Sequence, residues 1–407
     1  MESSEPRPAG PTGRRPRWRV VFAAFAATAH GPGVHYIYGV FQAALLDAKA
    51  LTTSRAWLGG AGGLSTCLML LGARPAGTLQ AAHGAGFVVG GGAAIAVVGL
   101  LLCAAATQLW MLYVGFGVLV GVGHALQFAP CPVAVAEAFD GSERAALASG
   151  VATSGSGVGT AALGALVTAV VVWRNWRIAF VFVAASTAFF VAPAAIVFRH
   201  ADRWRREVDK ATSLTASRRL KHLCATAFCY AFGWEVPFVH LVSYAEDAGH
   251  APSRAAGVVI AIGVGGSAGR IVSARCADAV GAPRVFFALI LATCAADLAL
   301  PWAIRHASAL YVYGAVAGTT AGGLIALTTP MARTCLTDTS GLPQASGAVY
   351  SSMAIGVVAG PVLVGLVRDR VGSYAWGFRS AAFCWAVAFA LSLTLPRQPA
   401  ARRPGVS

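Results

Sequence analysis

Charged side chains are scarce in this sequence. Only 12% of the 407 residues are Asp, Glu, Lys or Arg, whereas 57% are hydrophobic. A soluble globular protein carries about 25% charged residues, so the composition excludes that class. The sequence instead predicts a polytopic membrane protein.

Motifs for metal binding are also missing. The nine cysteines form no Cys-x-x-Cys pair, and no His-Glu-x-x-His sequence is present. These gaps argue against a zinc site, a disulfide framework and a membrane-embedded metalloenzyme. We therefore expect no enzyme activity, no metal and no cofactor, and interpret the cysteines as small apolar filler.

Long polar segments are almost absent from the chain interior, where the only one is residues 199–221. The apolar stretches around it predict twelve membrane spans, each about 20 residues or more and so able to cross a hydrocarbon core of about 30 Å. The expected spans are 19–46, 56–80, 85–106, 109–135, 145–171, 177–198, 222–245, 255–276, 284–303, 308–330, 344–367 and 375–396.

The basic segment divides these spans six and six, which predicts an all-α membrane protein built from two six-helix bundles. The expected parts are an N-terminal tail (1–18), a first bundle (19–198), a basic linker (199–221), a second bundle (222–396) and a C-terminal tail (397–407).

Acidic residues are outnumbered, and the formal net charge is +15. If the N-terminus lies inside, Lys and Arg gather in the inside segments, above all in the linker and the two tails. This placement follows the positive-inside rule and indicates topology rather than a nucleic-acid partner. We expect cytoplasmic termini, contact with the lipid bilayer and, by default, the plasma membrane.

A weak internal repeat supports the division. Ala148-Ser-Gly begins a small-residue segment in the fifth span, and Ala345-Ser-Gly begins a similar one in the eleventh. The two lie about half a chain apart, each in the fifth span of its half. Small residues let membrane helices approach closely, so we expect both segments at helix contacts.

Several segments, taken in order, resemble the monocarboxylate transporter family of the major facilitator superfamily. The resemblance covers nearly the whole chain and rests on Gly121–Pro130, Arg144–Gly150, Trp176-Arg177-Ile-Ala-Phe180, Pro237–Tyr244 and the run from Gly360-Pro361 to Tyr374. It implies the twelve-helix fold of that superfamily and secondary transport by rocker-switch alternating access.

The sequence also departs from this family. The acidic-Gly-Gly-Trp opening of span one is absent, and the turn after span two reads Leu79-Gln-Ala-Ala-His-Gly84 where the family has Asp-Arg-x-Gly. The turn after span eight, Ala277-Asp278-Ala-Val-Gly281, keeps the acid. Asp278 and Arg284 are therefore our candidates for a gate, with an ordinary solvated loop as the alternative.

Arg270 is the most informative residue because it lies inside an apolar span. A charge at that depth costs about 2.5–3.5 kcal/mol even on lenient scales, so it needs a partner. Its planar fork suits a carboxylate, and the resemblance places it where the family binds substrate carboxylate. The family's acid one turn earlier is Gly266 here. The alternative is a structural ion pair with Glu235 or Asp297.

His35 lies in the Gly/Pro-interrupted middle of the first span, where lactate carriers have a Lys at about this position. Broken helices expose backbone groups that bind substrate, and histidine changes charge near neutral pH. We predict that His35 binds substrate or couples protons, with a neutral bundle histidine as the alternative. Tyr36 and Tyr38 are further substrate-binding candidates, and His30 is a weaker one.

Acids inside the spans are candidate proton carriers. Glu235 lies beside Pro237 in the seventh span, and Asp297 lies in the ninth. Together with His35 they form the predicted proton-coupling set. Glu137, at the end of span four, is expected to face water.

The leading hypothesis is a secondary carrier for a small organic anion, most simply a monocarboxylate, balanced by protons or a counter-anion. The alternative is a carrier of the same fold for another substrate, such as an oxalate/formate-type exchanger or an aromatic amino-acid-like or thyroid-hormone-like carrier. A non-transporting sensor stays open as a third class. Substrate, coupling ion, oligomeric state and any accessory membrane subunit are not readable from the sequence.

Overall fold

The computed structural model describes residues 18–48, 55–140, 142–202, 218–336 and 341–395, and the regular elements in these ranges are helices. The first half contains α1 (Trp18–His30), α2 (Pro32–Tyr36), α3 (Tyr38–Asp47), α4 (Arg55–Leu71), α5 (Ala73–His83), α6 (Ala85–Ala104), α7 (Leu109–Leu112), the π-helix η1 (Tyr113–Val120), α8 (Gly121–Phe128), α9 (Pro130–Ala138), α10 (Ala145–Trp173) and α11 (Trp176–Asp202). The second half contains α12 (Arg218–Trp234), α13 (Val236–Asp247), α14 (Pro252–Val280), α15 (Ala282–Ala303), α16 (Ala307–Thr334), α17 (Leu342–Val371) and α18 (Tyr374–Ser392).

Within the described residues, eight helical stretches are long and apolar enough to cross a membrane. They correspond to the third to sixth and eighth to eleventh predicted spans. The other four predicted spans are also helical, but the first, second and seventh are interrupted and the last is the 19-residue α18. Length and composition alone therefore support the uninterrupted spans more strongly than the broken ones.

The predicted linker, residues 199–221, lies mostly outside the described residues. Helix α11 continues to Asp202 and α12 begins at Arg218, so both ends of the 199–221 segment are helical. Residues 203–217, with most of the basic cluster, lie outside the described residues, as do 1–17 and 396–407 of the two tails.

The first span of each half is broken near its middle. In the first half, α1 ends at His30 and α2 begins at Pro32, with Gly31 between them; in the second, α12 ends at Trp234 and α13 begins at Val236. Proline lacks an N–H and clashes with the preceding turn, so it begins a helix easily but interrupts one. The first break lies between the buried His30 and His35, and Glu235 stands at the second.

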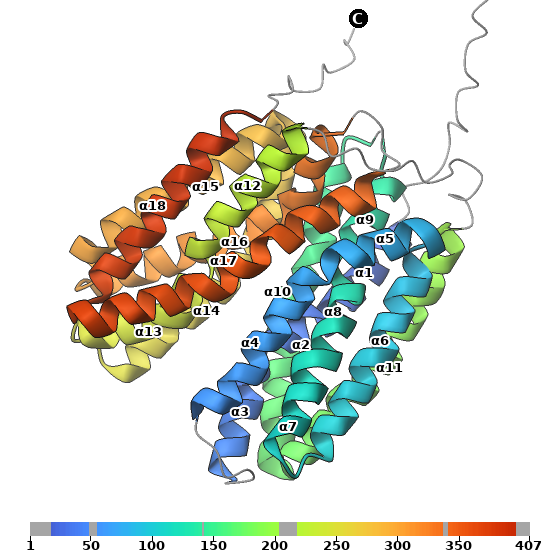
Figure 1. The fold of residues 1–407 in the computed structure, drawn as a ribbon, viewed down its shortest axis with the longest axis horizontal. Helices are drawn as coiled ribbons and strands as arrows, with labels where there is room; N and C mark the ends of the chain where they lie inside the picture. The colour runs from blue at the N-terminus through green and yellow to red at the C-terminus, as the bar shows by residue number, and fades with distance from the viewer. Residues whose placement is uncertain (1–17, 49–54, 141, 203–217, 337–340, 396–407) are drawn as a thin grey trace, which may run out of the picture.

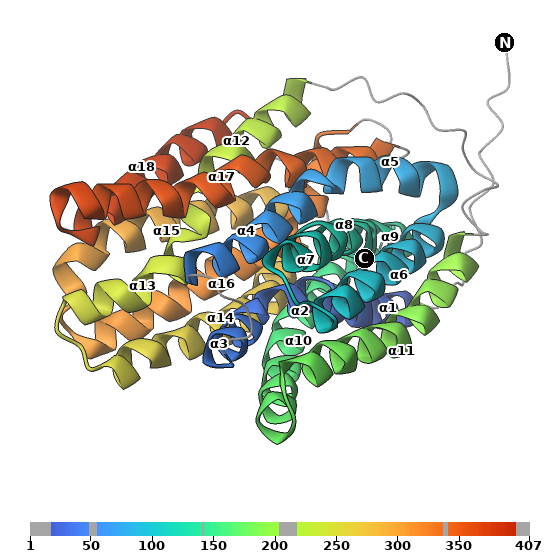
Figure 2. The same cartoon turned by 60° about the horizontal axis from the view of Figure 1, so that its bottom comes forward.

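The two halves lie side by side and meet toward one end of the molecule (Figures 1 and 2). We call this end the terminal face, because the first described helix begins there and the last one ends there. At this face Trp18 contacts Phe139, and His222 forms a hydrogen bond with Thr394. At the meeting, α10 lies against α14 and α17 lies against α4 and α5. Both repeat segments are on these contacting helices, as predicted.

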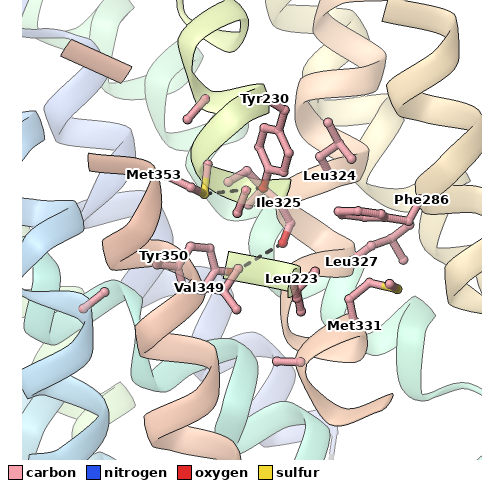
Figure 3. Packing of buried hydrophobic residues seen from close by; sticks show 14 of the residues in the cluster. Leu223, Tyr230, Phe286, Leu324, Ile325, Leu327, Met331, Val349, Tyr350 and Met353 are labelled. Atoms are coloured by element: carbon pink, nitrogen blue, oxygen red, sulfur yellow. Dashed lines mark hydrogen bonds between the residues drawn. The ribbon is translucent and has the colours of Figure 1, made fainter. Parts of the chain in front are cut away.

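A hydrophobic cluster joins the halves near the terminal face. It combines Leu70 and Phe128 of the first half with Tyr350 and Leu324 of the second. The rings of Phe128 and Tyr350 lie 4.8 Å apart, and the Tyr350 hydroxyl donates to the Ile325 carbonyl (Figure 3). Buried aromatic pairs and satisfied hydroxyls stabilise such a contact, so the halves are closed against each other at this end.

Candidate functional site

A cavity lies between the halves, beyond the closed contact. Counting its open mouth, it holds about 440 Å³ of space not occupied by atoms. Its wall is mostly apolar and aromatic, with a few polar groups, and is made by Pro32, Tyr36, Thr66, Met69, Leu70, Phe128, Ser156, Trp234, Glu235, Arg270, Ile325 and Val357.

Arg270 contributes the permanent cation of this cavity. Its side chain projects from α14 and is only 8% exposed. One guanidinium nitrogen donates to the carbonyl of Gly266, 2.9 Å away and one turn earlier, while Nε has no hydrogen-bond partner among the described residues. Neither Glu235 nor Asp297 forms an ion pair with it in the described part of the chain. The structural ion pair considered above is therefore not present.

Close helix packing explains why α14 can place this arginine at the interface. Gly150 of α10 lies directly against the backbone carbonyl of Arg270, where any larger side chain would collide with it. Gly318 and Gly322 of α16 lie equally close to the backbone of α14 near Gly266. The glycines allow the helix backbones to approach closely. Arg270 therefore lies at the contact between the halves, where its side chain lines the cavity.

Position 266 has room for a side chain. A Cβ there would lie 3.5 Å from the Arg270 guanidinium and 3.6 Å from the Gly318 carbonyl. Gly266→Asp is therefore expected to fold and to pair with Arg270 one turn later, because residues at this spacing are neighbours on a helix. The internal carboxylate would compete with an anionic substrate, and we expect KM for a carboxylate to rise about 10-fold.

Concentration-dependent uptake by reconstituted protein measures this effect, with Gly266→Ala as the control for volume. An unchanged KM in a folded Gly266→Asp protein would show that the Arg270 guanidinium does not contact the transported anion.

Glu235 and two aromatic residues surround the arginine. Glu235 occupies the break between α12 and α13 and lines the cavity with Trp234 and Tyr36. Tyr36 lies within electrostatic reach of both Glu235 and Arg270. The indole N–H of Trp234 is buried without an acceptor among the described residues. The structure thus brings three of the predicted residues, Arg270, Tyr36 and Glu235, to one place.

The other first-span candidates lie behind the cavity wall. His35 is 6% exposed, and its Nε2 lies 2.6 Å from the hydroxyl of Thr66, which does line the cavity. Tyr38 is buried against Phe116 and donates to the Leu58 carbonyl. His30 stacks on Phe190. The structure therefore does not place these three among the lining residues, although His35 reaches the lining through Thr66.

Asp297 lies apart from the cavity. It is fully buried in α15, and one carboxylate oxygen accepts a hydrogen bond of 2.6 Å from the hydroxyl of Tyr313 in α16. It is absent from the set of residues that line the cavity. Its position in the interior of the second bundle gives it no direct route to a cavity ligand.

The two gate candidates behave differently. Asp278, at the end of α14, accepts 2.9 Å hydrogen bonds from the backbone N–H groups of Ala146 and Leu147, the first turn of α10 in the other half. A carboxylate satisfies the free N–H groups of a helix N-terminus and its positive dipole. Arg284 is exposed and donates to the Val280 carbonyl in its own half.

A second link crosses the terminal face, an ion pair between Asp140 after α9 and Arg333 of α16. The corresponding cap is missing on the other side, because the residue three positions before Gly84 is Ala81, whereas Asp278 stands three positions before Gly281. There α17 meets α4 and α5 through small residues such as Gly77 and Gly347. The Ser351 hydroxyl of α17 also accepts from the Arg74 backbone N–H and lies within hydrogen-bond distance of the Leu70 and Leu71 carbonyls. The closed end is thus held by charged side chains on one side and by close packing and Ser351 on the other.

Sequence reasoning missed several residues at or near the site. Trp234, Thr66 and Ser156 line the cavity. His124 and Gln127, in α8, are fully buried close behind it. A signal was present for the last two, because polar residues three positions apart in an apolar span mark one polar helix face.

Comparison with known proteins agrees with this architecture. Residues 19–261 and 223–406 match the Major Facilitator Superfamily. Monocarboxylate transporter 13 of Rattus norvegicus is 29% identical over 393 residues, which span 93% of this chain and 89% of that protein. Monocarboxylate transporter 11 of Homo sapiens is also 29% identical, over 92% of this chain and 81% of that protein.

Solved structures show the same fold at lower identity. The human organic anion transporter MFSD10 (TETRAN) superposes with a TM-score of 0.72 at 16% identity, covering 93% of this chain and all of that one. The E. coli fucose:proton symporter FucP (N162A) superposes with a TM-score of 0.69 at 14% identity, covering 93% and 98%. The protein is a multi-pass membrane transport protein that belongs to the Major Facilitator Superfamily.

Proposed function

We propose that this protein carries a small organic anion, most simply a monocarboxylate, by alternating access. One observation carries the proposal: a buried arginine without an acidic partner among the described residues projects into a cavity between the halves. A carboxylate with two oxygens fits the free guanidinium edge and provides the compensating charge.

The closure at the terminal face supports an alternating mechanism. That end is shut by the Asp278 cap and the Asp140–Arg333 pair, and the halves diverge toward the other end (Figure 1), so we infer that the cavity opens there. Breaking these contacts and closing the other end by rocking of the halves would expose Arg270 to the terminal face, as in carriers that move two bundles around a fixed site.

Uptake by purified protein in liposomes tests the proposal. We expect accumulation of at least one of labelled lactate, pyruvate, formate or oxalate, and each is assayed with and without an inward proton gradient. Dependence on the gradient would identify proton coupling, and gradient-independent exchange would identify a counter-anion. Absence of uptake for all four, in protein shown to be folded, would overturn the proposed substrate class.

A second substrate class is favoured by the neighbours of Arg270. Glu235 shares the cavity without pairing with the arginine, and Tyr36, Phe128 and Trp234 add aromatic surface. A carboxylate and a separate ammonium group would find opposite charges, and a ring would find aromatic walls. We propose an aromatic amino-acid-like substrate as the alternative to a simple monocarboxylate.

A matched pair of ligands separates the two classes. Phenylalanine and 3-phenylpropionate share the ring and the carboxylate, but only the first carries an ammonium group. If the alternative holds, wild type prefers phenylalanine, and Glu235→Gln reduces that preference about 10-fold or more, since the variant loses the charge but keeps the shape. Competition for uptake of either labelled compound measures the ratio. If Glu235→Gln has the same preference as wild type, the amino-acid alternative is wrong and the monocarboxylate proposal stands.

The proposed setting follows from the same topology. We place the terminal face on the cytoplasmic side of the plasma membrane, because the basic linker and tails lie in segments connected to that face. Protons or a counter-anion would balance the substrate charge. No accessory membrane subunit is assigned.

A further inference from the structure

A group of polar side chains is buried inside the first bundle, behind the cavity wall. We call the group the histidine chamber; its members are His30, His35, Ser65, His124 and Gln127. None of them is more than 6% exposed. They come from α1, α2, α4 and α8, each of which contacts at least two of the others. The rings of His35 and His124 lie 6.3 Å apart, a separation that one water molecule can bridge.

Seven polar atoms of the chamber have no hydrogen-bond partner in the described part of the chain. They are His30 Nε2, His35 Nδ1, Ser65 Oγ, both ring nitrogens of His124 and both amide atoms of Gln127. Buried polar atoms almost always have a partner, and each one left bare costs about 1–3 kcal/mol. Such a concentration indicates that these atoms have partners other than the described side chains and backbone groups.

The hydrogen bonds at its edge determine which atoms face inward. The Thr66 hydroxyl has one proton and donates it to the Gly62 carbonyl, so it accepts from Nε2–H of His35. The neutral ring of His35 then carries a bare lone pair on Nδ1. His30 donates from Nδ1 to the Ala26 carbonyl, which leaves a bare lone pair on Nε2. Two proton-accepting nitrogens therefore remain without partners inside the bundle.

The chamber contains acceptors and donors but no carboxylate among the described residues. Water satisfies such a mixture, because it both donates and accepts. A metal cation fits poorly, since no group of three His, Cys, Asp or Glu in the described residues has metal-binding geometry. A transient positive charge suits it better, since imidazole nitrogens can accept a proton.

We propose that the histidine chamber is a hydrated proton-binding site, in which His35 and His124 hold the proton that accompanies the anion bound at Arg270. This inference rests on the proposed transport of an organic anion. A hydronium ion arriving from the cavity past Thr66 gives its proton to a ring nitrogen, an N–H bond forms as an O–H bond breaks, and water remains. The site lies wholly in the first half, whereas Arg270 belongs to the second.

Charge balance links the two sites. An anion on Arg270 adds a negative charge to the cavity, and a proton in the chamber compensates it, so that each ligand favours binding of the other. The proton on one half and the anion on the other would together promote the movement that carries both. Without the proton, net movement of the anion would build up a membrane potential that opposes it, whereas one-for-one exchange of anions would not.

Few other ionisable groups face the chamber. Helix α10, packed against α2, has none, and Glu235 and Arg270 lie across the cavity. Tyr36 lies beside His35, and the Tyr38 and Tyr113 hydroxyls donate to backbone carbonyls. The other ionisable residues in the sequences of the packed helices are Arg19 of α1, Asp47 of α3, Arg55 and Cys67 of α4, Arg74 and His83 of α5, Cys103 of α6, Cys131 and Glu137 of α9, Arg177, Arg199, His200 and Asp202 of α11, and Tyr350, Arg368, Asp369 and Arg370 of α17.

The test separates proton-coupled uptake from exchange. Liposomes that contain the pH-sensitive dye pyranine are supplied with labelled lactate or 3-phenylpropionate, and net uptake, lumen acidification and exchange at equal pH are measured. We expect His124→Gln, which keeps a polar side chain but binds no proton, to reduce net uptake and acidification at least 10-fold. Exchange needs no net proton movement and should change by less than about twofold.

His250→Gln is the matched control. His250 is also buried, but it lies in the second half and its Nε2 is bonded to the Ile304 carbonyl at 2.7 Å. Coupled uptake should survive this change. Gln127→Leu, which removes a water partner and no histidine, is a second test and should slow coupled uptake more than exchange.

The outcomes decide between the explanations. Loss of coupling with exchange retained supports the proposal. Equal loss of both activities in folded His124→Gln and Gln127→Leu proteins would indicate a structural role and overturn it. Wild-type exchange without lumen acidification would overturn the chamber proposal while leaving the anion-carrier proposal intact. No transport of either compound would instead count against the carrier proposal itself.

Discussion

Arg270→Gln is expected to reduce uptake of any carboxylate substrate by about 100-fold or more. Loss of one partner of a buried, hydrogen-bonded charge pair costs about 2–5 kcal/mol, and each 1.4 kcal/mol is a factor of ten. Glutamine keeps much of the volume and can still bond to the Gly266 carbonyl. The reduced uptake would therefore result from loss of the charge and of the bidentate hydrogen-bond donor, and not from lost side-chain volume.

Two controls accompany this measurement. Arg270→Lys keeps the charge but loses the planar fork, so we expect an intermediate loss. Arg254→Gln changes an exposed arginine near the start of the same helix and should transport like wild type. Wild-type uptake of a carboxylate by Arg270→Gln would contradict the proposed mechanism directly, whatever the substrate proves to be.

Asp278→Ala is expected to weaken the closed terminal face and to lower net transport about 10-fold. The variant loses two hydrogen bonds to the first turn of α10, and helix α10 has no side-chain cap of its own. Since the carboxylate is only partly buried, its loss should destabilise the closed contact by about 1–2 kcal/mol, a 10-fold shift between conformations.

Labelling from the terminal face reports the conformational shift. A cysteine at the cavity-lining position 156, in protein whose exposed Cys276 is replaced by Ser, should react with a charged maleimide faster in Asp278→Ala than in the parent. Asp278→Asn keeps one acceptor oxygen, so its labelling rate should lie between those of the parent and Asp278→Ala. If labelling rates and transport are unchanged, the contact between Asp278 and α10 does not control closure.

Part of this protein could be predicted from composition and order along the chain. Scarcity of charge and the length of the apolar stretches indicate membrane-spanning helices because a bilayer accepts little else. Gly31-Pro32 and Pro237 mark the two broken spans because proline interrupts the helical hydrogen bonds wherever it occurs. Arg270 stands out because a charge in an apolar run needs a compensating partner. These features depend on the local sequence and on the solvent, so they can be predicted without knowing which residues lie nearby in the folded protein.

Only the tertiary structure decides which groups meet. Glu235 and Asp297 are both acids in apolar spans, but the structure places only Glu235 in the cavity with Arg270. Asp297 instead accepts a hydrogen bond from Tyr313. It places the Asp278 carboxylate at the N-terminus of a helix in the other half, whereas Arg284 donates to the Val280 carbonyl in its own half. It gathers His30, His35 and His124 from separate helices into one chamber. Helix periodicity sets the face on which a residue lies, but the partner depends on how helices distant in sequence pack together.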